Sequence, residues 1–281
     1  MKYIEVTISC GIGDMPIVEH ILICHRIQGW VEQHALDYHA VVFYMPEEAS
    51  SLQAIAALSK EVEKMEGTGL ATRVLDGEDW EHSWKSHIKT QRVGKFVIKP
   101  TWEPVPALAP GEIVIELDPG MAFGTGDHAT TAMCLEMLER YLRPGDSVLD
   151  MGTGSAILSI AALYLDAGEV TAVDYDPVAV TVAGENLSHL GLRDRVRLFC
   201  ADVTALKEGA FDIVLGNIFL REVLSVLNQQ CPPLKSGGIF IGSGITYDQV
   251  PRIEEALRSA PFDLLIMEKR DIWASFAVRK H

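Results

Sequence analysis

Cysteine is scarce in this 281-residue sequence, and its spacing excludes two common uses of the thiol. The five cysteines are scattered, odd in number and never spaced as Cys-x-x-Cys. Such spacing is typical of neither a disulfide framework nor a zinc site, and it indicates reduced thiols in a cytoplasmic protein. These residues are Cys10, Cys24, Cys134, Cys200 and Cys231.

Positive charge is also in short supply. Lysine and arginine number 24 against 39 aspartates and glutamates, which gives a formal net charge of -15. Because a nonspecific grip on nucleic acid needs a basic face, direct nucleic-acid binding is not expected, whereas a basic protein partner is favoured. Long apolar runs are missing as well: none reaches the ~18 residues of a membrane-spanning helix, so no membrane contact is expected.

The chain is long enough for two domains, and its hydrophobic content of 48% supports a full core. Residues 1–75 alternate in the order strand, helix, two strands, helix, strand, which predicts a small ferredoxin-like α+β domain. Residues 76–104 are predicted to be a linker, with a helix followed by a strand. Three tryptophans and several lysines there are either an RNA-stacking surface or packing against both domains, and the acidic chain favours packing. Residues 105–281 form the second predicted domain.

The most informative stretch is 147–157, Ser-Val-Leu-Asp-Met-Gly-Thr-Gly-Ser-Ala-Ile. A short apolar run, two glycines and then a helical apolar pattern predict a buried strand, a tight turn and a helix. Glycine lets a ligand approach the backbone closely, and the helix start offers free N–H groups. The third glycine of a dinucleotide motif is replaced by Ile157, and Asp150 would repel a pyrophosphate. The turn therefore favours a neutral or cationic cofactor.

Polar residues follow the next predicted strands. Asp174 ends a strand about 20 positions after the glycine turn, where a carboxylate binds a ribose diol. Asp202 follows the third strand, where it can meet an adenine amine, and Asn217 stands at the tip of the fourth. Because ligands of parallel sheets bind at the carboxyl ends of strands, these residues are predicted to share one site with Asp150 and Gly152.

A glycine-rich loop precedes this region. Residues 118–131 read Asp-Pro-Gly-Met-Ala-Phe-Gly-Thr-Gly-Asp-His-Ala-Thr-Thr, a composition that requires sharp bends or a close ligand. Thr130 or Thr131 is predicted to cap the following helix. Asp127 and His128 resemble a metal pair, but no third ligand stands nearby, and no metal is predicted.

These motifs together resemble the ribosomal protein L-eleven methyltransferase (PrmA) family of class I, S-adenosylmethionine-dependent methyltransferases. The resemblance rests on the 118–131 loop, Val-Leu-Asp-Met-Gly-Thr-Gly at 148–154, Asn217-Ile218 and the tryptophan-containing words of 79–85, and it covers nearly the whole chain. It implies a Rossmann-like α/β sheet that follows the ferredoxin-like domain in the sequence. In this family the ferredoxin-like domain grips the substrate. The resemblance also implies S-adenosylmethionine as cofactor and the basic ribosomal protein L-eleven as partner.

The family pattern implies particular site residues. S-adenosylmethionine would contact Thr131, Gly152, Asp174 and Asn217, and Gly154 and Asp202 complete the predicted cofactor site. Asn217 and Phe123 are the predicted catalytic residues. The sequence departs from the pattern at three positions: family members commonly have Thr or His at 127, Pro or Glu at 129 and Gly at 156, where this chain has Asp127, Ala129 and Ala156.

The expected chemistry is methyl transfer to lysine or N-terminal amines. Most of the catalysis is positioning, since the reaction is an in-line displacement at a sulfonium carbon. A lysine, with a pKa near ~10.4, must first lose a proton, and desolvation would lower that pKa. The carbonyl of Asn217 is expected to align the amine while the Phe123 loop covers it.

Alternative functions are a methyltransferase of another protein lysine or of a small-molecule amine, and a non-catalytic RNA-binding protein based on the tryptophan- and lysine-containing linker. A nicotinamide oxidoreductase is disfavoured by Asp150 and Ile157.

Overall fold

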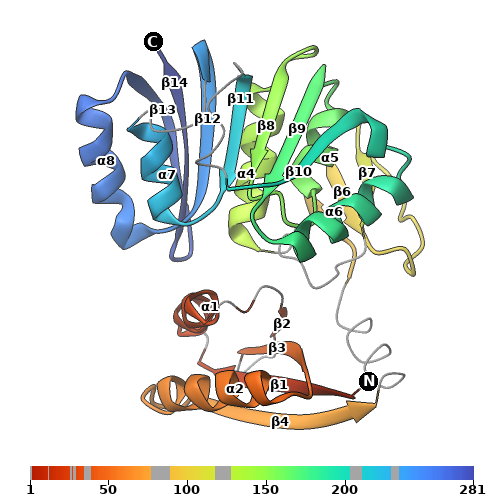
Figure 1. The fold of residues 1–281 in the computed structure, drawn as a ribbon, viewed down its shortest axis with the longest axis vertical. Coiled ribbons are helices and arrows are strands. Elements are labelled where there is room, and N and C mark those ends of the chain that lie inside the picture. Colours follow the sequence, from red (N-terminus) through yellow and green to blue (C-terminus); the bar gives the residue numbers. More distant parts are fainter. Residues whose placement is uncertain are drawn as a thin grey trace. The chain divides into compact units, whose positions relative to one another are not determined.

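The computed structural model describes the chain except for residues 1, 12, 26, 28–29, 35–38, 77–88, 118–127, 203–210 and 229–233, and except for the side chains of 23 and 31–34. It divides into two compact units, Met1–Lys89 and Thr90–His281. Each unit is drawn in Figure 1. In the described ranges, no helix is both long and apolar enough to cross a bilayer.

The first unit has the predicted ferredoxin-like order. Its elements are β1 (Lys2–Cys10), α1 (Met15–Cys24), β2 (Val31–His34), β3 (His39–Pro46), α2 (Ala49–Val62) and β4 (Gly69–Asp76). The described strands form an antiparallel sheet in the order β2-β3-β1-β4. Alternate residues of β1, among them Val6 and Ile8, are fully buried, and they join Val18 of α1 and Leu58 of α2 in one core. Both helices therefore cover the same face of the sheet.

The second unit begins earlier than the sequence predicts. Strands β5 (Gln91–Val93) and β6 (Phe96–Lys99) lie within the stretch assigned to a linker, but β6 pairs in parallel with β7 (Ile113–Glu116). The physical reason is burial: Phe96, Val97 and Ile98 all enter the core, which a solvated linker would not do. The predicted linker helix falls on residues outside the described part of the chain.

A buried ion pair ties this small sheet to the rest of the unit. Lys99 on β6 is only 2% exposed, and its ammonium donates to Glu116 on β7. Glu116 also bonds the ring of His189, the last residue of α6 (Pro177–His189), at 2.9 Å. The bonds from Lys99 and His189 lower the pKa of Glu116 below its ordinary value. The paired carboxylate compensates for burial of the lysine charge.

The main sheet has the predicted Rossmann-like architecture. Its strands are β8 (Ser147–Met151), β9 (Glu169–Asp174), β10 (Val196–Cys200), β11 (Phe211–Asn217), β12 (Leu234–Thr246), β13 (Phe262–Arg270) and β14 (Trp273–Lys280). In the described part of the unit they are ordered β10-β9-β8-β11-β12-β14-β13. The first five are parallel, whereas β14 runs antiparallel to both of its neighbours.

Helices cover both faces of this sheet (Figure 1). The α-helices are α4 (Ala129–Tyr141), α5 (Ile157–Tyr164), α6 (Pro177–His189), α7 (Leu220–Leu227) and α8 (Val250–Ser259). Residues of α4, α5 and α6 share one core with Val148 and Leu215, while α7 and α8 pack in a second core with Leu149 and Val214. Adjacent strand residues thus point to opposite faces, as the pleat requires. The carboxyl ends of β8 to β12 are called the carboxyl edge below.

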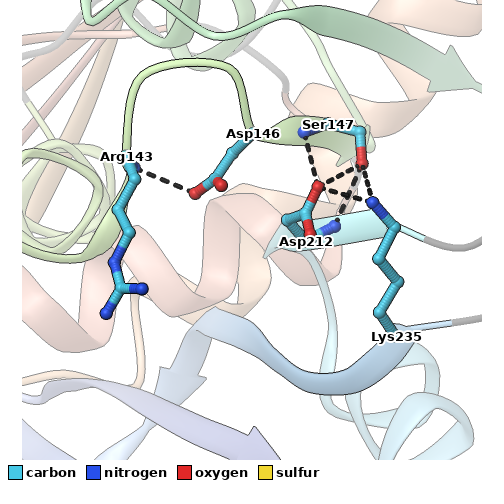
Figure 2. Close-up of polar contacts among 5 residues, drawn as sticks. All are labelled: Arg143, Asp146, Ser147, Asp212 and Lys235. Carbon is cyan, nitrogen blue, oxygen red and sulfur yellow. Dashed lines mark hydrogen bonds and ion pairs between the residues drawn. The ribbon is translucent and has the colours of Figure 1, made fainter.

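An ionic cluster joins the amino-terminal ends of β8 and β11, at the edge of the sheet opposite the carboxyl edge (Figure 2). One oxygen of Asp212 accepts the backbone N–H of Ser147 at 2.9 Å, its hydroxyl at 2.7 Å and Nζ of Lys235 at 2.7 Å. In the same view, Asp146 accepts the backbone N–H of Arg143 at 2.9 Å. Burial acts to raise the pKa of Asp212, but the bonds from Lys235 and Ser147 outweigh it and hold the pKa at about 2.

Asp212→Asn should therefore remove a pH-dependent part of the stability. A carboxyl whose folded-state pKa lies below its ordinary value stabilises the fold above pH ~4, and the contribution is lost as pH falls toward ~2. Because a third of the side chain is exposed, the expected loss at pH 7 is only about 1–2 kcal/mol. Urea unfolding of both proteins should show the difference shrinking from pH 7 to pH 3, and a difference that stays constant would contradict this. Asp146→Asn, which affects only the bond to Arg143, is the control.

Candidate functional site

The turn after β8 is shaped by three residues with positive φ. Gly152, Gly154 and Ala156 have φ of 69°, 53° and 68°. Glycine adopts this conformation readily, whereas alanine does so at a cost of roughly 1–2 kcal/mol. A Cβ on Gly152 would also lie 2.6 Å from Ile218 Cγ2. The departure from glycine at position 156 is thus accepted with a small, buried side chain, while position 152 has no room for one.

The turn is bonded to the tip of β9. The N–H groups of Gly152 and Thr153 donate to the carbonyl of Val173 at 2.8 and 3.1 Å. One oxygen of Asp174 accepts the N–H of Gly154 at 3.0 Å, and the other accepts the N–H of Asp176 at 3.0 Å. Each carboxylate oxygen keeps further lone pairs, so Asp174 can still accept from two hydroxyls. Asp174 is only 6% exposed, and burial raises its pKa, although the backbone bonds oppose that rise.

Asp150 lies beneath the turn and is almost completely buried. Its Oδ2 accepts the hydroxyls of Thr153 and Ser159, each at 2.7 Å. Its Oδ1 is buried and has no hydrogen-bond partner within the described residues. Burial raises the pKa of Asp150, against the lowering effect of the two hydroxyls. A buried acceptor without a donor is costly, so this oxygen marks a place where a positively charged group would be stabilised.

Asn217 ends β11 at the same edge of the sheet. Its amide nitrogen donates to Oγ1 of Thr131 on α4 at 3.3 Å. An amide nitrogen only donates, so the carbonyl oxygen of Asn217 is the atom that can accept from an incoming amine. The sequence placed Thr131 and Asn217 in one site although 86 positions separate them, and the structure brings them together.

The helix that carries Thr131 begins differently from the prediction. Its N-cap is His128, whose Nδ1 accepts the N–H of Thr130 at 3.3 Å. The prediction that Thr130 or Thr131 caps the helix is wrong, because both lie inside α4 and are 1% exposed. The ring of His128 meets that of Trp273 edge-on, with centroids 4.9 Å apart. The position of Trp273 beside the start of α4 was not predicted from the sequence, because it depends on the packing of β14 against α4.

The two remaining predicted site residues are Asp202 and Phe123. Asp202 is exposed just beyond β10. The hydrogen bond and charge of Glu222 raise the pKa of Arg221, and the charge of Asp202 adds a smaller contribution. Phe123, like Asp127, lies outside the described residues. Within the residues that the structure does describe, no group of three His, Cys, Asp or Glu side chains is placed to hold a metal.

Gly244 fixes the position of Asn217. It follows Ser243, the register partner of Asn217, and it has φ of +80°. A Cβ there would lie 2.6 Å from the carbonyl oxygen of Ile218 and 3.0 Å from its nitrogen. Because both atoms belong to backbone, an added methyl would have to push β12 away from the residue that follows Asn217.

Gly244→Ala is therefore expected to destabilise the fold by about 3 kcal/mol, from backbone strain and overpacking together. Gly237→Ala is a matched control, because Gly237 has φ of +78° on the same strand and nothing within 4 Å of an added Cβ. The control should lose only the strain, about 1 kcal/mol. Urea unfolding measures both, and equal losses would show that the contact with Ile218 is unimportant.

Known proteins resemble this chain over most of its length. The family model described as ribosomal protein L11 methyltransferase (PrmA) matches residues 12–281. A ribosomal protein L11 methyltransferase of Symbiobacterium thermophilum is 34% identical over 306 residues, covering 100% of both chains. One of Desulfosudis oleivorans is 42% identical over 210 residues, 73% of this chain and 69% of its own.

A solved structure extends the comparison to the fold. The crystal structure of the ribosomal protein L11 methylase of Lactobacillus delbrueckii subsp. bulgaricus has a TM-score of 0.64 at 34% identity, and the match covers 69% of this chain and 100% of that one. The family model and the relative from Symbiobacterium thermophilum span both compact units. The chain belongs to the ribosomal protein L11 methyltransferase (PrmA) family.

Proposed function

We propose that this protein transfers methyl groups from S-adenosylmethionine to lysine or N-terminal amines of ribosomal protein L11. The observation that carries the proposal is the placement of Asn217, held by Thr131 at the carboxyl edge that also presents the glycine turn and Asp174. The names of the relatives, which are L11 methyltransferases, support the substrate. The chain's net charge of -15 suits a basic protein partner.

The residues of the edge fit S-adenosylmethionine. The positive φ of Gly152 and Gly154 leaves the backbone open to close approach. Asp174 is proposed to accept from the ribose hydroxyls, and the buried Oδ1 of Asp150 favours the cationic end of the molecule. Thr131, Asn217 and Asp202 complete the proposed cofactor site.

The reaction asks the protein mainly to position an amine. When bound, S-adenosylmethionine supplies an electrophilic methyl group on a sulfonium. The carbonyl of Asn217 accepts a hydrogen bond from the neutral amine and directs its lone pair, and Thr131 keeps the amide from rotating. Phe123 is proposed to cover the amine and exclude water, which would lower the pKa of a lysine acceptor. Holding the reactants in line accounts for a large part of the rate.

Asp150→Asn should lower the affinity for the cofactor without lowering the stability of the fold. An acid whose folded-state pKa is raised stabilises the fold only below its ordinary pKa, and that contribution is lost as pH rises through the raised value. The ionised carboxylate thus destabilises the fold at neutral pH, so the variant should have an equal or higher Tm. Its cofactor affinity should fall, because the negative charge is gone. A lower Tm with unchanged affinity would contradict the assignment, and Ser159→Ala, which removes one donor and keeps the charge, is the control.

The proposed place of action is the cytoplasm, where ribosomal proteins are made, and direct binding of nucleic acid or membrane is not part of the proposal. The second candidate, a methyltransferase of another protein lysine or of a small amine, uses the same edge and differs only in the acceptor. A non-catalytic RNA-binding protein rests on tryptophans of which two lie outside the described residues.

The proposal is tested with purified components. The protein is incubated with S-adenosylmethionine and purified L11, and the product is analysed by intact mass and peptide mapping. Methyl groups on L11 amines are expected, and they should be absent when S-adenosylhomocysteine is substituted. Cofactor binding by calorimetry without methylated L11 would point to the second candidate. Failure of both would exclude a methyltransferase.

A further inference from the structure

The exposed aromatic side chains of the described structure are all found at one edge. The large aromatic residues that are exposed are Tyr175, Phe199, Phe219 and Tyr247, between 50% and 65% accessible. Each lies at or just beyond the carboxyl end of a parallel strand, from β9 to β12. Tyr175 and Phe199 stand on the side of Asp174, and the other two on the side of Asn217. Exposed aromatic rings gathered in this way indicate an interaction surface.

Phe219 and Tyr247, here called the aromatic pair, extend from backbone that is fixed next to Asn217. The N–H of Ile218 donates to the carbonyl of Ser243 at 3.2 Å, which joins the two strand tips. Phe219 follows directly and is the N-cap of α7. The N–H of Tyr247 donates to the carbonyl of Ile272 at 2.6 Å. Phe219 is therefore tied to the turn that presents the proposed amine-binding amide, and Tyr247 is anchored just beyond β12, the strand that pairs with β11.

The ring of Tyr247 already holds a positive charge. Nζ of Lys269 lies 4.1 Å from the ring centroid, within the range of a cation–π contact. Both side chains are exposed, so the lysine is exchangeable with another cation. Asp248 is the next residue and adds a negative charge to the same short helix. The contact shows that this ring face accepts an ammonium group at the surface.

We propose that the aromatic pair is the surface on which the polypeptide substrate lies beside its target amine. Phe219 packs against apolar or methylene groups of the substrate. Tyr247 receives a lysine or arginine side chain of the substrate in the place that Lys269 occupies in the free protein. The inference rests on the proposed function. It goes further by naming the feature of the substrate that the protein recognises, which is a cationic side chain next to the amine that is methylated.

The test removes the aromatic ring or only the hydroxyl of Tyr247, and it also removes the ring of Phe219. For wild type, Tyr247→Leu, Tyr247→Phe and Phe219→Ala, we would measure kcat and KM for purified L11 and the calorimetric Kd values of L11 and S-adenosylmethionine. Tyr247→Leu keeps an apolar side chain but loses the π face, and it should raise KM and Kd for L11 roughly 3- to 30-fold. Tyr247→Phe should restore both, while the cofactor Kd stays unchanged. Phe219→Ala should raise KM similarly.

Two further variants serve as controls. Lys269→Met should leave KM unchanged or lower it, because the competing internal cation is removed. A rise in KM equal to that of Tyr247→Leu would contradict the proposal that a substrate cation replaces Lys269 on the ring of Tyr247. Leu264→Ala changes a side chain of similar exposure, 48%, elsewhere on β13, and should have no effect.

The outcomes separate the two proposals. Unchanged KM and Kd in both Tyr247→Leu and Phe219→Ala, with an active wild type, would overturn the inference alone. L11 binding that depends on Tyr247, without methyl transfer by the wild type, would overturn the proposed function and support the surface. Absence of both binding and transfer in the wild type would overturn both.

Discussion

Replacing Asp174 by alanine is expected to weaken the binding of S-adenosylmethionine by about 100-fold or more. Each hydrogen bond from a ribose hydroxyl to a charged carboxylate contributes roughly 1.5–3 kcal/mol, and two would be lost together. The substitution also leaves the N–H groups of Gly154 and Asp176 without their acceptors, which loosens the glycine turn. Isothermal calorimetry with S-adenosylmethionine and S-adenosylhomocysteine measures the loss directly.

Asp176→Ala is the matched control for this experiment. Asp176 lies two residues away and is the N-cap of α6, where its side chain accepts the N–H of Val178 at 2.8 Å. Its removal should cost about 1 kcal/mol of stability and leave the cofactor Kd nearly unchanged. An Asp174→Ala protein that bound both ligands as tightly as the control would show that the ribose is held elsewhere.

Replacing Asn217 by alanine is expected to lower kcat by roughly 100- to 1000-fold, the range seen when one preorganised polar group is removed from an active site. The amide is tied to Thr131 and is proposed to align the amine. The Kd for the cofactor should rise far less than kcat falls, because Asp174 and the glycine turn are intact. Single-turnover kinetics at saturating cofactor separates the two effects.

Thr131→Val provides an intermediate case. It removes the acceptor that orients the amide of Asn217 but leaves the carbonyl oxygen in place, so a loss of about 10-fold in kcat is expected. If Asn217→Ala retained normal turnover with normal cofactor affinity, the alignment role would be wrong. If Thr131→Val were as damaging as Asn217→Ala, Thr131 would have a direct role of its own.

Much of the site followed from the sequence because parallel strands end at one edge. The strand-glycine-helix pattern located β8, its turn and α5, and the spacing to Asp174 located the tip of β9. The structure brings Asp174 to Gly154 and Asn217 to Thr131 by hydrogen bonds that no local pattern encodes. Their convergence was nevertheless predictable, since it depends on strand order and direction.

Other features could not be predicted as easily. The imidazole of His128 caps α4, although the residues that usually cap helices are Ser, Thr, Asp and Asn. The hydroxyls of Thr153 and Ser159 reach Asp150 only after the turn has folded. In contrast, α7 was missed although its buried residues, Leu220, Val223, Val226 and Leu227, follow a helical period.

The second unit begins at Thr90, within residues 76–104, which were predicted to be a linker that contains a strand. All four residues of β6 are buried, and β6 belongs to the second unit because it pairs with β7, a long-range contact that the composition of this stretch does not reveal. Burial in a tertiary core overrode the local composition, which is rich in tryptophan and lysine.

A labelling experiment tests methyl transfer to L11 most directly. A lysate of cells that lack this protein is incubated with the purified enzyme and S-adenosylmethionine carrying a tritiated methyl group, and the labelled species is identified by mass. Label is expected in ribosomal protein L11 with wild type, and very little with Asn217→Ala. Label in another protein would contradict the substrate, and no label, together with no cofactor binding by calorimetry, would contradict the enzymatic function.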